Sequence, residues 1–229
     1  MAMNVLDLFC GCGGISAGFE LADFRIAGGI DNNPDAVTTF SKNFPDARAF
    51  CADLSEVSRD WIKSNYGDSQ IQVIVGGPPC QGFSSANRHS KESEDPRNKL
   101  FFEYLKFVDV LKPRIVVIEN VRGILTRSNG YAKRRIFDLL ETMGYKVNAQ
   151  VLDASEFGVP QRRLRTFFVA TRDNTEFDFD RMIKCHSTPT VKDAIGDLYH
   201  LTKDGSRKLS KPTTKGLGQY FHSKNELTN

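Results

Sequence analysis

The sequence contains no long apolar run. No window of the 229 residues approaches the about eighteen consecutive apolar side chains that suggest a membrane-spanning helix. Met1-Ala2-Met3-Asn4 leads directly into an apolar, strand-like segment at residues 5–9, without the features of a secretory leader. We therefore expect no membrane span, no signal peptide and a cytoplasmic protein.

Cysteine and histidine are scarce and scattered. The five cysteines are odd in number, and the four histidines do not cluster near them. A disulfide framework or a zinc site would need paired or closely spaced ligands, so we expect reduced thiols and no metal site. The sequence also shows no internal repeat.

Positive charge is in small excess, because the sequence holds 31 Lys and Arg residues against 28 Asp and Glu residues. Residues 199–229 hold six basic residues against two acids. Two further clusters consist of Arg122, Arg127, Lys133, Arg134 and Arg135, and of Arg162, Arg163 and Arg165. One such cluster is typical of a solvated face, whereas three together favour a nucleic-acid partner.

Short apolar segments alternate with helical patterns along most of the chain. Strands are predicted at residues 5–9, 25–30, 47–51, 72–75 and 115–118, and helices at 14–22, 34–44, 55–65, 99–111 and 131–143. This alternation is typical of an α/β fold with a doubly wound, mostly parallel sheet. Only twelve residues without a helical pattern separate the last two predicted strands, 145–152 and 165–171, so we expect an antiparallel strand at one end.

Residues of the types found in binding and catalytic sites follow each of the five predicted parallel strands. They are Gly11-Cys12-Gly13-Gly14, Asp31, Asp53, Cys80 and Glu119-Asn120. Open α/β sheets bind their ligands at the carboxyl ends of parallel strands. The sequence therefore predicts a ligand site along this edge.

The glycine-rich turn indicates a nucleoside ligand. Gly11, Gly13 and Gly14 allow close backbone approach, and Asp31, about twenty residues later, could accept a ribose hydroxyl. A plain dinucleotide site is the alternative, but the third glycine of its motif is replaced by Ser16. S-adenosylmethionine, which lacks phosphates, fits better. Asp53 would accept from the adenine amino group, or would be an ordinary turn residue.

Cys80 follows two prolines at the end of a buried strand. Pro78 and Pro79 fix the backbone and remove two donors, so the thiol is carried on a rigid turn. A buried structural cysteine is the alternative interpretation. The functional residues at the neighbouring strand ends favour a nucleophile.

Four segments, in this order, closely resemble motifs of the C5-cytosine DNA methyltransferases. They are Asp7-Leu8-Phe9-Cys10-Gly11-Cys12-Gly13-Gly14, Gly77-Pro78-Pro79-Cys80-Gln81-Gly82-Phe83-Ser84, Glu119-Asn120-Val121 and Gln161-Arg162-Arg163-Leu164-Arg165. The resemblance covers residues 4–198 and implies a Rossmann-like fold that binds S-adenosylmethionine. It also implies DNA methylation of the restriction-modification type.

The resemblance assigns roles to individual residues. It implies that the cofactor is bound by Phe9, Gly11, Cys12, Gly13, Gly14, Ile15, Asp31, Asn32, Asp53, Leu54, Pro78 and Leu100. It implies that the base is acted on by Cys80, Glu119, Arg163 and Arg165. Asp31 stands where the family usually has Glu, which shortens the reach to the ribose and keeps the charge.

Cytosine C5 is too weakly nucleophilic to take a methyl group directly. If the Cys80 thiolate adds to C6, electron density moves to C5. A free thiol with a pKa of about 8.5 is mostly protonated at neutral pH, so nearby positive charge should help, and Arg163 or the cofactor sulfonium could supply it. Glu119 would hydrogen-bond the cytosine edge as N3 gains electron density.

A cytosine inside a duplex cannot reach such a pocket and must be flipped out. Residues 84–99 form a long polar stretch, which is typical of a functional lid, with a simple spacer as the alternative. We expect this stretch to contact double-stranded DNA through Ser84, Ser85, Asn87, Arg88 and Arg97.

Three other functions share part of this pattern. A zinc-dependent cytosine deaminase needs a second cysteine where Phe83 stands, and His89 is not followed by the required glutamate, so this function is excluded. An RNA cytosine-5 methyltransferase remains possible. A catalytically silent DNA-binding homologue is also possible, although the intact Cys80 and Glu119 argue against it.

The resemblance ends before the family's target-recognition region and last motifs. Residues 1–198 are predicted to form the cofactor-binding and catalytic domain, and 199–229 a basic linker or the start of the missing region. We expect a complementary polypeptide or segment to supply base-sequence readout.

Overall fold

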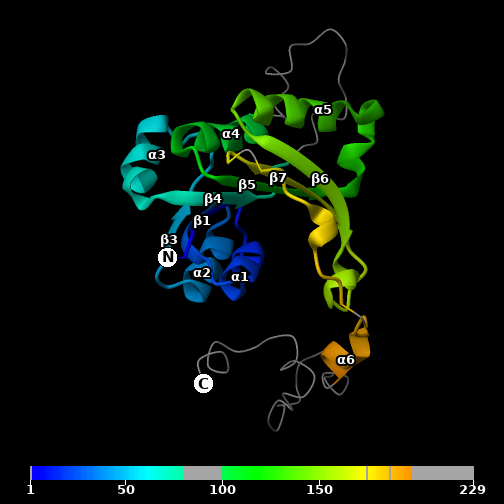
Figure 1. Ribbon diagram of the computed structural model, residues 1–229. Helices are drawn as coiled ribbons and strands as arrows, with labels where there is room; N and C mark the ends of the chain where they lie inside the picture. Colours follow the sequence, from blue (N-terminus) through cyan, green and yellow to red (C-terminus); the bar gives the residue numbers. More distant parts are fainter. Residues whose placement is uncertain (1, 80–98, 174, 186, 197–229) are drawn as a thin grey trace. The chain divides into compact units, whose positions relative to one another are not determined.

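The computed structural model (Figure 1) describes residues 2–79, 99–173, 175–185 and 187–196. One sheet contains seven strands in the order β3-β2-β1-β4-β5-β7-β6. The strands are β1 (Asn4–Leu8), β2 (Arg25–Asp31), β3 (Arg48–Cys51), β4 (Ile71–Gly76), β5 (Ile115–Val121), β6 (Lys146–Asp153) and β7 (Leu164–Thr171).

The first five strands pair in parallel, because β1 lies between β2 and β4, β3 pairs with β2, and β5 pairs with β4. At the other end, β7 lies between β5 and β6. The residue after β7, Arg172, donates its amide to Arg114 O just before β5, at 3.0 Å, so these strands run in opposite directions. The predicted doubly wound sheet with an antiparallel end is confirmed.

Helices cover both faces of the sheet (Figure 1). α1 (Gly14–Leu21) and α2 (Pro34–Asn43) lie on one face, and α3 (Arg59–Tyr66), α4 (Lys99–Leu111) and α5 (Arg127–Thr142) lie on the other. Alternate side chains of β1 supply the two cores: Val5 packs with Phe40 of α2, whereas Leu6 belongs to the core that contains Tyr104 of α4. A strand buried on both faces is expected in a parallel sheet.

Local signals fix the helix starts. Asn33 caps α2, since its side chain accepts from the amides of Asp35 and Ala36, and Pro34 occupies the first helical position as predicted. The helix predicted from residue 55 instead begins at Arg59, because the Ser58 hydroxyl caps it by accepting from Trp61 N at 3.1 Å. Short 3-10 helices occur at η1 (Gly67–Ser69), η4 (Arg122–Leu125), η5 (Ala154–Phe157) and η6 (Phe179–Arg181).

The chain divides into two compact units. The first comprises Met1–Val151 and Thr166–Phe179, and the second comprises Leu152–Arg165 and the described residues from Asp180 onward. The second unit contains α6 (Val191–Ile195), whose first turn has a capping box between Thr190 and Asp193. Among the described residues, no helix combines the length and apolarity needed to cross a bilayer. The predicted basic segment 199–229 lies outside the described residues.

Candidate active site at the carboxyl edge of the sheet

The glycine-rich turn between β1 and α1 has an unusual backbone. Phe9, Gly11 and Gly13 all have positive φ, at 62°, 54° and 93°. This conformation is uncommon for a bulky residue such as Phe9, and strained residues of this kind cluster at functional sites. A side chain at Gly13 would collide with the Phe44 ring, whereas Cβ atoms built at Gly11 and Gly14 meet nothing within 4 Å. The turn therefore leaves open space beside its backbone.

Asp31, at the end of β2, holds this turn. Its Oδ2 accepts from Gly11 N at 2.8 Å, and its Oδ1 accepts from Asn33 N at 2.9 Å. Each carboxylate oxygen can accept a second hydrogen bond, so Asp31 could support the loop and still accept from a ligand hydroxyl. The predicted neighbour Asn32 is exposed, and its carbonyl accepts from the Cys51 thiol.

Asp53 follows β3 and forms a tight turn. Its Oδ1 accepts from Ser55 N at 2.8 Å, and this hydrogen bond holds the pKa of the Asp53 carboxyl below its ordinary value. Leu54 is buried, and Lys106 of α4 donates to Leu54 O at 3.3 Å and also to Val57 O. The structure thus presents an ionised carboxylate on a turn that is bonded to α4.

The end of β4 lies close to both of its neighbours, β1 and β5. A Cβ built at Gly76 would lie 2.2 Å from Leu8 O of β1, and one at Gly77 would lie 3.3 Å from Glu119 Oε2 of β5. The Asn120 side chain donates to Pro78 O at 2.9 Å. The backbone that leads into Cys80 is therefore held beside the Glu119 carboxylate, with glycines where a side chain would obstruct the approach.

These elements fit the predicted nucleoside cofactor. Open space lies beside Gly11 and Gly14, and the neighbouring strand ends offer the carboxylates of Asp31 and Asp53 as acceptors. Hydroxyl and amino groups are the donors that carboxylates accept from. No group of three His, Cys, Asp or Glu side chains in the described part of the chain could hold a metal ion.

The remaining predicted cofactor residues lie on the same elements. Ile15 is half-buried in the first turn of α1, and Leu100 is half-buried in the first turn of α4. Cys12 is exposed, and its carbonyl accepts from the Asn43 side chain at 2.9 Å. Cys80, Ser84, Ser85, Asn87, Arg88 and Arg97 lie outside the described residues.

Arg163 and Arg165 belong to the second compact unit. Asp153 organises their turn, because its Oδ1 accepts from Ser155 N at 3.1 Å and from Arg163 N at 3.0 Å. The Ser155 amide makes the largest contribution to lowering the pKa of the Asp153 carboxyl. The Arg163 side chain is exposed and Arg165 is half-buried.

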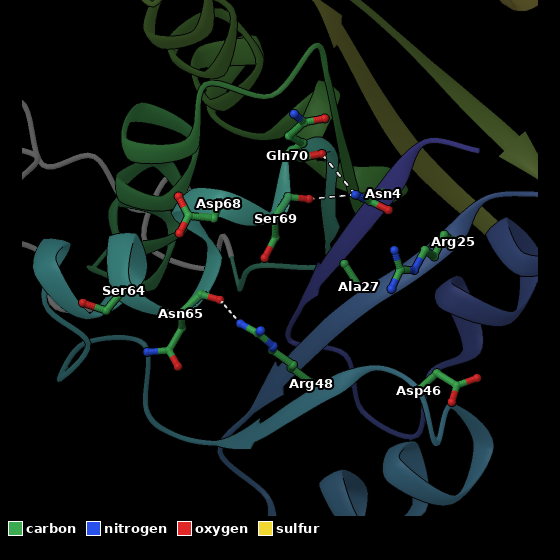
Figure 2. A pocket seen from close by; sticks show the side chains of 10 residues that line it. All are labelled: Asn4, Arg25, Ala27, Asp46, Arg48, Ser64, Asn65, Asp68, Ser69 and Gln70. Carbon is green, nitrogen blue, oxygen red and sulfur yellow. Dashed lines mark hydrogen bonds between the residues drawn. The ribbon is translucent and has the colours of Figure 1, made fainter. Parts of the chain in front are cut away.

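A polar cavity of about 460 Å³ opens elsewhere on the first unit (Figure 2). Its lining includes Asn4, Arg25 and Arg48, which lie at the amino ends of β1, β2 and β3. Arg48 donates to Asn65 O, and Asn4 donates to Ser69 O (Figure 2). The cavity therefore lies at the edge opposite the predicted site and contains none of its residues.

Sequence reasoning missed two supporting residues, Asp7 and Lys106. Asp7 is an acid within an apolar strand, an anomaly that marks it for attention, and it is only 1% exposed. Lys106 carries no sequence signal, because its bonds to Leu54 and Val57 depend on how α4 packs.

Comparisons with known proteins agree with this geometry. The family model described as C-5 cytosine-specific DNA methylase matches residues 3–227. The Type II methyltransferase M1.HphI of Haemophilus parahaemolyticus is 38% identical over 202 residues, covering 88% of this chain and 54% of that protein. M.DdeI of Desulfomicrobium norvegicum, also a Type II methyltransferase, is 40% identical over 206 residues, covering 86% of this chain and 48% of that protein.

A crystal structure also resembles the chain. It is of a prophage-encoded protein from E. coli described as a DNA modification methyltransferase. It matches with a TM-score of 0.72 and 31% identity, and the match covers 85% of this chain and 54% of that one. The chain thus spans about half the length of these relatives.

Proposed function

The chain belongs to the C-5 cytosine-specific DNA methylase family, and from this premise we propose that it is the catalytic part of a DNA (cytosine-5-)-methyltransferase of a restriction-modification system. It would transfer a methyl group from S-adenosylmethionine to C5 of a cytosine in double-stranded DNA, with S-adenosylhomocysteine as the other product. The Type II methyltransferases among its relatives support this assignment.

One observation supports the catalytic assignment most directly. The Glu119 carboxylate faces the backbone of Gly77, three residues before Cys80, and Asn120 is hydrogen-bonded to Pro78 between them. A nucleophile and an acid-base group must be held near one another before the substrate enters. The paired ends of β4 and β5 bring the backbone that precedes Cys80 close to the Glu119 carboxylate.

The cofactor, when bound, supplies a methyl group on a positively charged sulfonium. The residues proposed to hold it are the Phe9–Gly14 turn, Asp31 and Asp53. Asp31 would accept from a ribose hydroxyl, and Asp53 from the adenine amino group. Both carboxylates are suited to this role because each is fixed by hydrogen bonds from backbone amides.

The proposed role of Cys80 is nucleophilic. Its thiolate forms a bond to C6 of the cytosine, and the electron pair of the C5–C6 double bond becomes available at C5. Glu119, in its protonated form, donates a hydrogen bond to the base edge at N3, where negative charge develops. After C5 has gained a methyl group, loss of the C5 proton to a base re-forms the double bond and expels the thiolate. Arg163 and Arg165 are proposed to contact the base or favour the thiolate.

The cytosine must leave the duplex to react, which costs a few kcal/mol of stacking and pairing. We assign the holding of the opened DNA to Ser84, Ser85, Asn87, Arg88 and Arg97. The two acid-free basic clusters, at residues 122–135 and 162–165, would add contacts to phosphates.

Recognition of a base sequence is assigned to a second polypeptide or segment. The relatives M1.HphI and M.DdeI are about twice as long as the part of them that the chain covers. We propose that the missing portion reads the target sequence and completes the cofactor site.

The first experiment measures transfer of labelled methyl groups from S-adenosylmethionine to DNA and to tRNA. The chain is assayed alone and mixed with the product of the neighbouring reading frame. We expect labelled DNA, unlabelled tRNA, and a loss of at least about 100-fold in kcat for Glu119→Gln. The control Glu141→Gln alters a carboxylate of α5 outside the proposed site and should keep full activity.

Each alternative has its own outcome in this assay. Labelled tRNA with unlabelled DNA would identify an RNA methyltransferase. Transfer to neither, with the complete partner present, would indicate a silent homologue. Full sequence-specific activity of the chain alone would refute the need for a second polypeptide.

A further inference from the structure

Asp7 is a buried acid that the proposed reaction does not use. It lies within β1 between Leu6 and Leu8, and all three side chains are inaccessible or nearly so. Its Oδ2 accepts from the Ser16 hydroxyl at 2.7 Å. Its Oδ1 is the one buried side-chain oxygen or nitrogen among the described residues that lacks a hydrogen-bond partner. Leaving a buried polar atom unpaired is costly, so the position of Asp7 requires an explanation.

The partner of Asp7 lies in the first turn of α1. The N-cap of this helix is Gly13, which has no side chain to accept from the first amides of the helix. The Ser16 hydroxyl in this first turn donates instead to Asp7 on the neighbouring strand, at 2.7 Å. The helix start is therefore anchored by a residue outside the helix.

This anchor spans the glycine-rich turn. Asp7 precedes the turn by two residues, and Ser16 follows Gly13 by three. Between them, Phe9 has a φ of 62°, a conformation that persists only where the surrounding structure enforces it. Asp31 holds the middle of the turn at Gly11, and the contact from Asp7 to Ser16 holds its two ends.

The surroundings of Asp7 disfavour its charged form. Burial raises the pKa of the carboxyl to about 7, with a smaller upward contribution from the Asp31 carboxylate and a downward one from the Ser16 hydrogen bond. The other titratable groups that sense Asp7 are the Cys10 thiol and the Tyr104 phenol of α4. None of these three neighbours is a cation.

We propose that Asp7 is a positioning residue for the cofactor, which holds the Phe9–Gly14 turn in place through the hydrogen bond that it accepts from Ser16. The proposal rests on the proposed function only for the identity of the ligand. Its structural part, that Asp7 keeps the turn ordered, is tested on the chain without cofactor.

Amide hydrogen exchange of the Phe9–Gly18 segment in the cofactor-free chain tests this directly. After correction for intrinsic exchange rates, we expect Asp7→Ala to raise the opening constant of this segment about tenfold over that of the wild type at pH 6. Asp60→Ala, which changes an exposed acid in the first turn of α3, is the matched control and should behave as the wild type. Equal exchange in the wild type and Asp7→Ala would overturn the proposal.

Ser16→Ala keeps the proposal testable if Asp7→Ala does not fold. This change removes the hydroxyl and leaves Asp7 in place, and should raise opening of the segment about tenfold at pH 6. It should weaken S-adenosylhomocysteine binding by a similar factor, measured by titration calorimetry. Unchanged exchange would refute the anchor. Altered exchange with unchanged affinity would refute its role in cofactor positioning, and a wild-type chain that fails to bind at all would count against the proposed function instead.

Discussion

At the scale of single residues, the glycine-rich turn contains two kinds of glycine. Gly13 is required by the fold, because a Cβ there would lie 2.3 Å from a Phe44 ring carbon and its φ is 93°. Gly14 has no such constraint, since a Cβ there meets nothing within 4 Å. Its absent side chain leaves the open space that we assign to the cofactor. The packing requirement in this motif therefore falls on Gly13.

Gly13→Ala should therefore destabilise the protein, by about 2–4 kcal/mol, because it adds overpacking to an unfavourable φ. The matched change Gly14→Ala should leave the free energy of unfolding unchanged or raise it by up to about 1 kcal/mol. Urea unfolding followed by circular dichroism measures both. Equal losses for the two variants would show that the collision with Phe44 does not limit stability.

The residue types at the strand ends could be predicted from the sequence, but their contacts could not. Asp31 and Asp53 are recognisable because each follows an apolar segment. That Asp31 bonds Gly11, and that Asp7 bonds Ser16, depends on tertiary packing across 20 and 9 residues. A local pattern contains no information about such distances.

At the scale of elements, α4 supports the turn that carries Asp53. Lys106 donates to the carbonyls of Leu54 and Val57 and pairs with Glu103, and both charged side chains are at least 80% buried. Buried carbonyls that lose their donor cost about 1–3 kcal/mol each. The position of Asp53 thus depends on a helix that begins near the proposed lid.

Lys106→Met should therefore lower stability by about 1–3 kcal/mol and weaken S-adenosylhomocysteine binding about three- to tenfold. Thermal unfolding and calorimetric titration give the two values. Lys63→Met, on the exposed face of α3, is the control and should change neither. A loss of stability with unchanged affinity for S-adenosylhomocysteine would show that α4 does not support the cofactor site.

The elements themselves were predicted well where periodicity and capping agree. α2 begins at Pro34, as Asn33 indicates. α3 begins later than predicted, because the Asp53 carboxylate and the Ser58 hydroxyl each bind amides nearby and exclude a helix before Arg59. Competition between two local signals is difficult to resolve without the fold.

At the scale of the whole molecule, the strand order gathers most of the proposed site at one edge. The parallel strands β1 to β5 bring the glycine-rich turn, Asp31, Asp53 and Glu119 to this edge. Arg163 and Arg165 belong to a second compact unit. Since the chain spans about half of its relatives, we expect the surface that selects the cytosine to lie in the other half.

The central claim is that Cys80 attacks C6 of a cytosine, and trapping the adduct tests it most directly. DNA in which every cytosine is replaced by 5-fluorocytosine avoids the need to know the target sequence, and fluorine at C5 blocks release of the thiolate. The chain is incubated with this DNA, S-adenosylmethionine and the product of the neighbouring reading frame. Denaturing electrophoresis and peptide mass spectrometry then locate the adduct. We predict a stable complex joined at Cys80, absent in Cys80→Ser and unchanged in Cys185→Ser. Methylation of ordinary DNA by the same mixture without an adduct at Cys80 would contradict the account.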